Sequence, residues 1–150
     1  MHLTQAHFLS VAALLGLFAG SSQGLGINCR GSGMCPTGDH LVAENLRNSI
    51  NGAPDDKTFK KGDHIACDPS AGGTAPWIPG LPRLGGEICA FVQSVDSMTG
   101  KQVKALAQRI VDHGCKVCGS APLDKEKNDV KYGQLTFNYV TKPKCKEGLC

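Results

Sequence analysis

Eight cysteines constrain the fold of this chain more than any other feature of its 150 residues. Their number is even, and all of them follow residue 24, at positions 29, 35, 67, 89, 115, 118, 145 and 150. In a small exported domain, such a set predicts four disulfides. Aromatic residues make up only 5% of the sequence, so we expect a modest hydrophobic core that depends on these bridges.

The spacing of Cys115 and Cys118 also occurs in metal and redox sites. A zinc site needs a second pair of ligands, and the sequence has no second CxxC motif and no matching pair of histidines. A thioredoxin-like site needs a strand-to-helix context, which this motif lacks. We therefore expect no metal and no cofactor. In an extended segment, positions i and i+3 point to opposite faces, so two separate bridges can leave this one short stretch.

The first residues are expected to direct export. Residues 8–19 form an apolar run of signal-peptide length, and small and polar residues follow at 20–24. A membrane span needs about 20 apolar residues, so this run is too short for an anchor. We expect a signal peptide at 1–24 and one secreted, extracellular domain at 25–150.

The charge of the chain is mildly basic, with 16 Lys and Arg, 13 Asp and Glu, and a net charge of +3. This balance suits loose attraction to anionic cell walls or membranes. It is well short of the dense basic face that nucleic-acid binding requires. We expect a monomer that binds no nucleic acid.

The periodicity of apolar residues predicts two helices. The first is expected to begin at a cap on Thr37 or Asp39 and to end at Ile50. The second is expected to begin at a capping box formed by Thr99 and Gln102 and to run to about residue 113. Strands are expected at 25–30, 64–67, 87–95, 115–119 and 133–140. This order of helices and strands indicates the α+β class.

Residues 53–86 interrupt this pattern with many prolines and glycines. Apart from the short strand at 64–67, we expect this segment to be irregular. A long Pro/Gly-rich segment in a compact domain is either a functional loop or a poorly ordered insertion.

An enzymatic function would need a pair of acid and base groups, as in a small secreted ribonuclease. No candidate falls in a recognisable catalytic motif, and a histidine at a helix C-terminus, such as residue 113, has a structural explanation in the helix dipole. We therefore expect a protein that is not an enzyme. The candidate acid and base groups are His40, His64, His113, Glu44 and Glu87.

Several blocks of the sequence resemble the secreted fungal killer-toxin family, whose type member is virally encoded in a smut fungus. The blocks are Leu-Gly-Ile-Asn-Cys-Arg-Gly-Ser at 25–32, Ala-Phe-Val-Gln-Ser at 90–94, His-Gly-Cys-Lys-Val-Cys-Gly-Ser at 113–120, Asn-Asp-Val at 128–130 and Gly-Gln-Leu-Thr at 133–136. The resemblance implies a small disulfide-stapled α/β sandwich. In that fold, two antiparallel helices cover one face of a mainly antiparallel sheet, and the connections are split β-α-β units.

The resemblance also implies a disulfide pairing. Two pairs come directly from the family, and the other two are favoured because Cys145 aligns with the family's terminal cysteine. The expected pairs are Cys29–Cys115, Cys35–Cys118, Cys67–Cys145 and Cys89–Cys150.

The function that the resemblance implies is block of calcium channels from outside the cell, which would inhibit the growth of competing fungi or plant cells. The expected partner is then a membrane channel or another cell-surface protein of the target cell. An alternative is a secreted effector of the same fold with a target other than a channel, and a secreted ribonuclease is a further one.

The residues that would contact a target are expected in the loop before Cys67. In the family, the important lysine lies two residues before the cysteine that aligns with Cys67, and here this position is Ile65. A cation on a rigid protrusion would be attracted to the acidic ring of a cation-selective pore. The candidates in this loop are Lys57, Lys60, Lys61 and His64, and the alternative interpretation is an ordinary solvated charged turn.

Overall fold

The structure is a computed structural model that describes residues 26–38, 40–69, 86–145 and 147–150. The signal peptide expected at 1–24 and residues 70–85 of the Pro/Gly-rich segment lie outside the described residues. The two helices are α1 (Val42–Ile50) and α2 (Gly100–Asp112), and a short 3-10 turn, η2, spans Val130–Tyr132. The strands are β1 (Thr58–Lys60), β2 (His64–Asp68), β3 (Glu87–Gln93), β4 (Ser97–Thr99), β5 (Gly119–Pro122), β6 (Gln134–Val140) and β7 (Gly148–Leu149).

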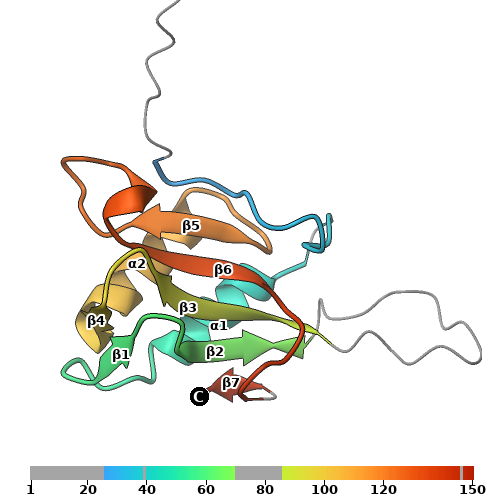
Figure 1. Ribbon diagram of the computed structural model, residues 1–150. Helices are drawn as coiled ribbons and strands as arrows, with labels where there is room; N and C mark the ends of the chain where they lie inside the picture. The colour runs from blue at the N-terminus through green and yellow to red at the C-terminus, as the bar shows by residue number, and fades with distance from the viewer. Residues whose placement is uncertain (1–25, 39, 70–85, 146) are drawn as a thin grey trace, which may run out of the picture.

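Five of the strands form one antiparallel sheet in the order β5-β6-β3-β2-β7. The strands β1 and β4 form a separate antiparallel pair. Both helices lie behind the large sheet in Figure 1 and cover one of its faces. The fold is α+β with a helical layer on an antiparallel sheet, as the sequence predicted.

The connection from β3 through α2 to β5 is a split β-α-β unit. Strands β3 and β5 both pair antiparallel with β6, so they are parallel to each other with β6 between them. The two helices run antiparallel, because each end of α1 meets the opposite end of α2. Near the start of α1, the Ala43 N–H donates to the Lys116 carbonyl beyond α2, and after the end of α1, the Asp55 carbonyl accepts from the Lys101 N–H.

The core lies between the helices and the sheet. In β3 and β6, alternate residues pack toward the helices, as the period-2 pattern predicted for strands with a buried face. Burying a large apolar side chain contributes about 1.5–3 kcal/mol to the free energy of unfolding. The largest fully buried apolar side chains are those of Phe137, Leu46, Ile50, Ile65, Ile88, Met98, Ile110 and Leu135.

The two helices begin differently. At α2, the predicted capping box is present, because the Thr99 hydroxyl accepts from the Gln102 N–H and the Gln102 side chain accepts from the Thr99 N–H. At α1, the predicted cap is wrong. The N-cap residue is Leu41, which makes no side-chain cap hydrogen bond, and its side chain is exposed. Thr37 lies too far before Val42 to cap the helix, and Asp39 lies outside the described residues.

Several strand predictions also need correction. The strand expected at 115–119 begins only at Gly119, because residues 119–122 are the ones that pair with β6. Cys115 and Cys118 therefore precede the strand. The strand expected at 25–30 is reduced, in its described part, to a bridge between Asn28 and Ser120. Within 53–69, expected to be irregular outside 64–67, the chain also forms β1.

The disulfides agree with half of the expected pairing. The structure has Cys29–Cys115 and Cys35–Cys118, which tie the N-terminal segment to the residues just before β5. In place of Cys67–Cys145 and Cys89–Cys150, it has Cys67–Cys89 and Cys145–Cys150. The reason for this correction is the strand register, because Cys67 and Cys89 lie directly opposite each other on β2 and β3.

Candidate functional site

The basic turn, which we define as residues 57–64, connects β1 to β2 and carries the candidate target-binding residues. At its tip, the Lys60 N–H donates to the Asp63 carboxylate at 2.9 Å, and the Asp63 N–H donates to the Lys60 carbonyl at 2.9 Å. Gly62 adopts φ +78°, a conformation that favours glycine. These contacts fix the backbone of the turn while the side chains of Lys60 and Lys61 stay exposed.

The tip of the turn is bonded to the neighbouring part of the sheet. The Lys61 N–H donates to the Asp96 carbonyl at 2.8 Å, and the Gly62 N–H donates to the Val92 carbonyl at 2.9 Å. Two lysines are therefore presented from a backbone that is held on both sides. Such a turn loses little conformational entropy when it binds a partner.

Lys57 is placed differently from the other two lysines. Its Nζ lies 4.8 Å from the centroid of the Phe59 ring, in a cation–π contact. Phe59 is buried in the core and lies opposite Met98 across the β1–β4 pair. One cation of the turn is thus held against the body of the protein, whereas Lys60 and Lys61 project from its tip.

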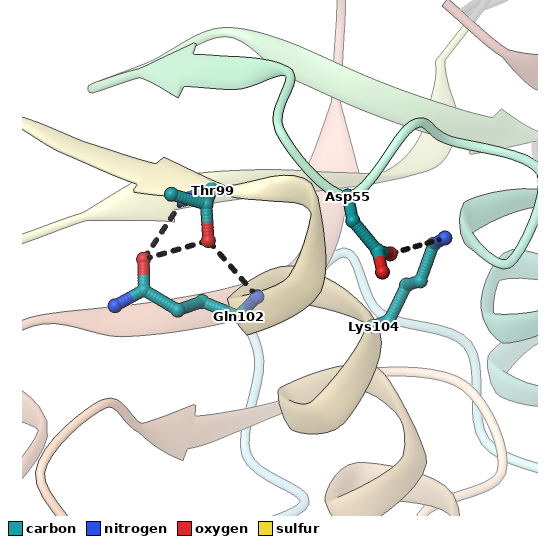
Figure 2. A network of polar contacts seen from close by, with 4 residues as sticks. All are labelled: Asp55, Thr99, Gln102 and Lys104. Atoms are coloured by element: carbon teal, nitrogen blue, oxygen red, sulfur yellow. Dashed lines mark hydrogen bonds and ion pairs between the residues drawn. The ribbon is translucent and has the colours of Figure 1, made fainter.

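The start of the basic turn and the residues before it are bonded to the first turn of α2. The Gly100 N–H donates to the Lys57 carbonyl at 2.7 Å. Figure 2 shows the Lys104 ammonium reaching the Asp55 carboxylate at 2.8 Å, beside the Thr99 and Gln102 capping box. The hydrogen bond from Lys104 is the main cause that lowers the pKa of Asp55. The basic turn is therefore anchored to α2 as well as to the sheet.

His64 joins the turn to the C-terminal tail, residues 141–150. Its Nδ1 accepts a hydrogen bond from the Lys144 N–H at 3.0 Å, and the Lys144 ammonium lies 3.8 Å from the Asp63 carboxylate. Burial of the ring is the main cause that lowers the pKa of His64, the charge of Lys144 lowers it further, and the charge of Asp63 opposes both. The neutral imidazole is thus favoured, and it acts here as an acceptor for the tail.

Lys144 is a member of the site that sequence reasoning did not include among its first candidates. It is 80 residues away from His64 in the sequence, and only the fold brings the two together. The one signal in the sequence was the position of Lys144 beside Cys145, which was expected to pair with Cys67.

Ile65, two residues before Cys67, has a fully buried side chain. This position therefore contributes to the core and cannot present a cation at the surface. The exposed cations nearest in sequence are those of the basic turn.

The candidate acid and base groups lie on separate elements. His40 precedes α1, Glu44 lies within it, Glu87 begins β3, and His113 is the C-cap of α2. The His64 ring contacts the Lys144 backbone and the Phe91 ring. The carboxylate whose charge acts on His64 is that of Asp63, which accepts a hydrogen bond from the Lys60 N–H.

Two groups of side chains could in principle hold a metal ion in the part of the chain that the structure describes. They are His64 with Cys67 and Cys89, and Cys67 with Cys145 and Cys150. All four cysteines are in disulfides, so no thiolate is present to bind a metal. Among the described residues, no helix is both long and apolar enough to cross a bilayer.

Comparison with known proteins finds a similarity along most of the chain. A family model described as Kp4 matches residues 11–141. The KP4 killer toxin of the Ustilago maydis P4 virus is 36% identical over 139 residues, which cover 89% of this chain and 91% of the toxin. The residues that the family model matches include the basic turn, both helices and the strands β2, β3, β5 and β6 of the large sheet.

Proposed function

The chain belongs to the Kp4 family and is a killer-toxin-like protein, and from this premise we propose that it is secreted and blocks calcium channels from outside the cell. The result would be inhibition of the growth of competing fungi or plant cells. The partner would be a membrane channel or another cell-surface protein, and the protein would act as a binding toxin and not as an enzyme.

The observation that carries this proposal is the rigid presentation of Lys60 and Lys61. Cation-selective pores bear rings of acidic side chains, which attract an external cation. A lysine on a fixed backbone can approach such a ring without first ordering a loop. Lys144 adds a third cation beside the turn, through its contact with Asp63.

Secretion is supported by the apolar run at 8–19 and by the four disulfides. Disulfides form and persist in oxidising compartments and are rare in the cytosol. The experiment is mass spectrometry of the protein recovered from culture medium. A mature chain that begins at Leu25 is expected, and retention of the full-length protein inside the cell would contradict secretion.

The test of the binding surface is the double variant Lys60→Gln, Lys61→Gln. We expect it to fold normally and to lose at least tenfold in growth inhibition, because it removes both cations at the tip without changing the backbone. Interactions between exposed charges are screened over about 10 Å at 0.1 M salt, so added salt should weaken inhibition by the unchanged protein. External calcium should also relieve it if the target is a calcium channel.

The matched control is Lys125→Gln, Lys127→Gln, which removes two lysines from the mixed-charge loop between β5 and β6. It is expected to keep the potency of the unchanged protein. If the first variant keeps full potency, or if the control loses it, the basic turn is not the binding surface. The lysines of the C-terminal tail would then be the next to replace.

A second candidate function is an effector of the same fold with a different target. The burial of Ile65 favours it, because the position of the family's important lysine no longer offers a cation. Calcium imaging of sensitive fungal hyphae or plant roots treated with the protein separates the two functions. Growth inhibition with an unchanged calcium influx would support the effector and contradict channel block.

A further inference from the structure

Two of the four disulfides lie close to each other: Cys67–Cys89, which joins β2 to β3, and Cys145–Cys150 in the tail. The Sγ atoms of Cys67, Cys145 and Cys150 are all within 4.8 Å of one another, although Cys67 belongs to one bridge and the other two form the next. A sulfur of one bridge is thus close enough to attack the other after a small rotation of its side chain. We call these four residues the sulfur cluster: Cys67, Cys89, Cys145 and Cys150.

The fold itself produces this proximity. Cys67 lies opposite Cys89 on β3 and opposite Gly148 on β7. Gly148 adopts φ +74°, and the Cys150 N–H donates to the Ile65 carbonyl at 2.8 Å. These contacts hold the last residues of the tail over the Cys67–Cys89 bridge.

The cluster can be reached from solvent on one side. Cys150 is exposed and Cys145 is partly buried, whereas Cys67 and Cys89 are fully buried. A polar cleft of about 510 Å³ opens between α1, the end of β2 and the tail, and Cys67 and Gly148 are among the residues that line it. Because Cys150 is the most exposed residue of the cluster, we expect a small thiol to reach it first.

We propose that the sulfur cluster is a thiol–disulfide exchange site, at which a small external monothiol makes the two bridges exchange partners. The incoming thiolate bonds to Cys150 Sγ and releases Cys145 as a thiolate. Cys145 Sγ then bonds to Cys67 Sγ and releases Cys89. The Cys89 sulfur is not in the close group of three, so the closing step requires the tail to move: once its bridge to Cys145 is open, Cys150 approaches Cys89. Cys89 Sγ then bonds to Cys150 Sγ and expels the small thiolate, so the monothiol is regenerated and the number of disulfides is unchanged.

The other two bridges are not part of this site. Among the residues that the structure describes, the sulfurs of Cys29, Cys35, Cys115 and Cys118 form no close group of three. Exchange is therefore confined to the sulfur cluster, while the bridges that tie the N-terminal segment to β5 remain in place.

Exchange changes how the tail is attached to the domain. With Cys145–Cys150, the tail is bridged only to itself and is held to β2 by the short strand β7. With Cys67–Cys145, it is bonded directly to β2, one residue away from Lys144, whose backbone N–H contacts His64. A monothiol thus controls how firmly the tail is fixed beside the basic turn.

The first experiment treats the unchanged protein with a substoichiometric amount of reduced glutathione at about pH 8, where a useful fraction of thiols is ionised. Exchange is stopped with acid, and the bridges are mapped by mass spectrometry of non-reduced peptides. We expect Cys67–Cys145 and Cys89–Cys150 to appear beside the original pairs, with the other two bridges unchanged. Unaltered pairs, or scrambling of all eight cysteines, would overturn the proposal.

The second experiment uses Cys150→Ser, which leaves Cys145 as a free thiol next to the Cys67–Cys89 bridge. The free thiol is then labelled by alkylation. We expect the alkyl label to be divided between Cys145 and Cys89 without any added thiol. The control is Cys118→Ser, in which the label should stay on Cys35. A label found on Cys145 alone in the first variant, or spread over several cysteines in the control, counts against a dedicated exchange site.

Discussion

At the scale of single residues, His64 makes folding depend on pH. Its folded pKa lies below the ordinary value of 6.5, chiefly because the ring is buried and also because Lys144 is close. Between the two pKa values, the unfolded chain binds more protons than the folded protein. The contribution of His64 to stability is therefore complete above about pH 6.5 and is lost as the pH falls below it. Protonation would also remove the acceptor that Nδ1 offers to the Lys144 N–H.

We predict that His64→Gln removes this part of the pH dependence. The measurement is urea unfolding of the parent and the variant at several values from about pH 8 down to about pH 5, on either side of the ordinary pKa of histidine. The free energy of unfolding of the parent should fall more steeply than that of the variant. Parallel curves for the parent and His64→Gln would contradict the assignment.

Single residues also show where prediction from sequence was possible. The capping box could be predicted because Thr99 and Gln102 are three residues apart, so all its contacts are local. The contact of His64 with Lys144 could not, because it depends on the path of the tail across β2. The lysines of the basic turn were found by their proximity to Cys67 in the sequence, but their anchoring to Asp96 and Val92 required the fold.

At the scale of elements, Gly100 sits where α2 meets the segment that leads to the basic turn. A Cβ at this position would lie 1.8 Å from the Pro54 carbonyl oxygen, which is far closer than atoms can approach. We predict that Gly100→Ala destabilises the protein by about 1–3 kcal/mol, the usual cost of overpacking. This would occur although alanine has the higher helix propensity.

Thermal unfolding of Gly100→Ala and Gly33→Ala checks this prediction. A Cβ at Gly33 meets no atom within 4 Å, so its substitution should change stability by less than about 0.5 kcal/mol. Equal midpoints for the two variants would show that the contact of Gly100 with Pro54 does not position α2. A lower midpoint for Gly33→Ala than for Gly100→Ala would have the same meaning.

The elements that the sequence did not predict are the shortest ones. Strands β1 and β7 have three and two residues, too few for a pattern of alternation, and each exists because a distant strand pairs with it. The segment 119–122 contains Gly119 and Pro122, which are poor strand formers, and its strand is defined by pairing with β6. By contrast, β3, β6 and α2 have long periodic patterns and were predicted within a few residues.

At the scale of the whole molecule, the four disulfides are of two kinds, long-range and local. Cys29–Cys115 and Cys35–Cys118 join residues more than 80 positions apart, with separations of 86 and 83. Cys67–Cys89 and Cys145–Cys150 have separations of 22 and 5, and the sulfurs of Cys67, Cys145 and Cys150 lie close together. Their pairing could not be predicted from spacing alone, because it depends on the register that places Cys67 opposite Cys89.

The last prediction compares a long-range bridge with a local one. Part of the stabilisation by a disulfide comes from the entropy that it removes from the unfolded chain, and this term grows with the length of the closed loop. For a separation of 86, the chain-entropy relation gives about 4.6 kcal/mol, and for a separation of 5, it gives about 2 kcal/mol. The variant Cys29→Ala, Cys115→Ala should therefore lose roughly 2–3 kcal/mol more stability than Cys145→Ala, Cys150→Ala. Guanidinium unfolding of the two variants and the parent measures this difference. An equal loss in both would mean that the two bridges stabilise the protein mainly through contacts in the folded state and not through the entropy of the unfolded chain.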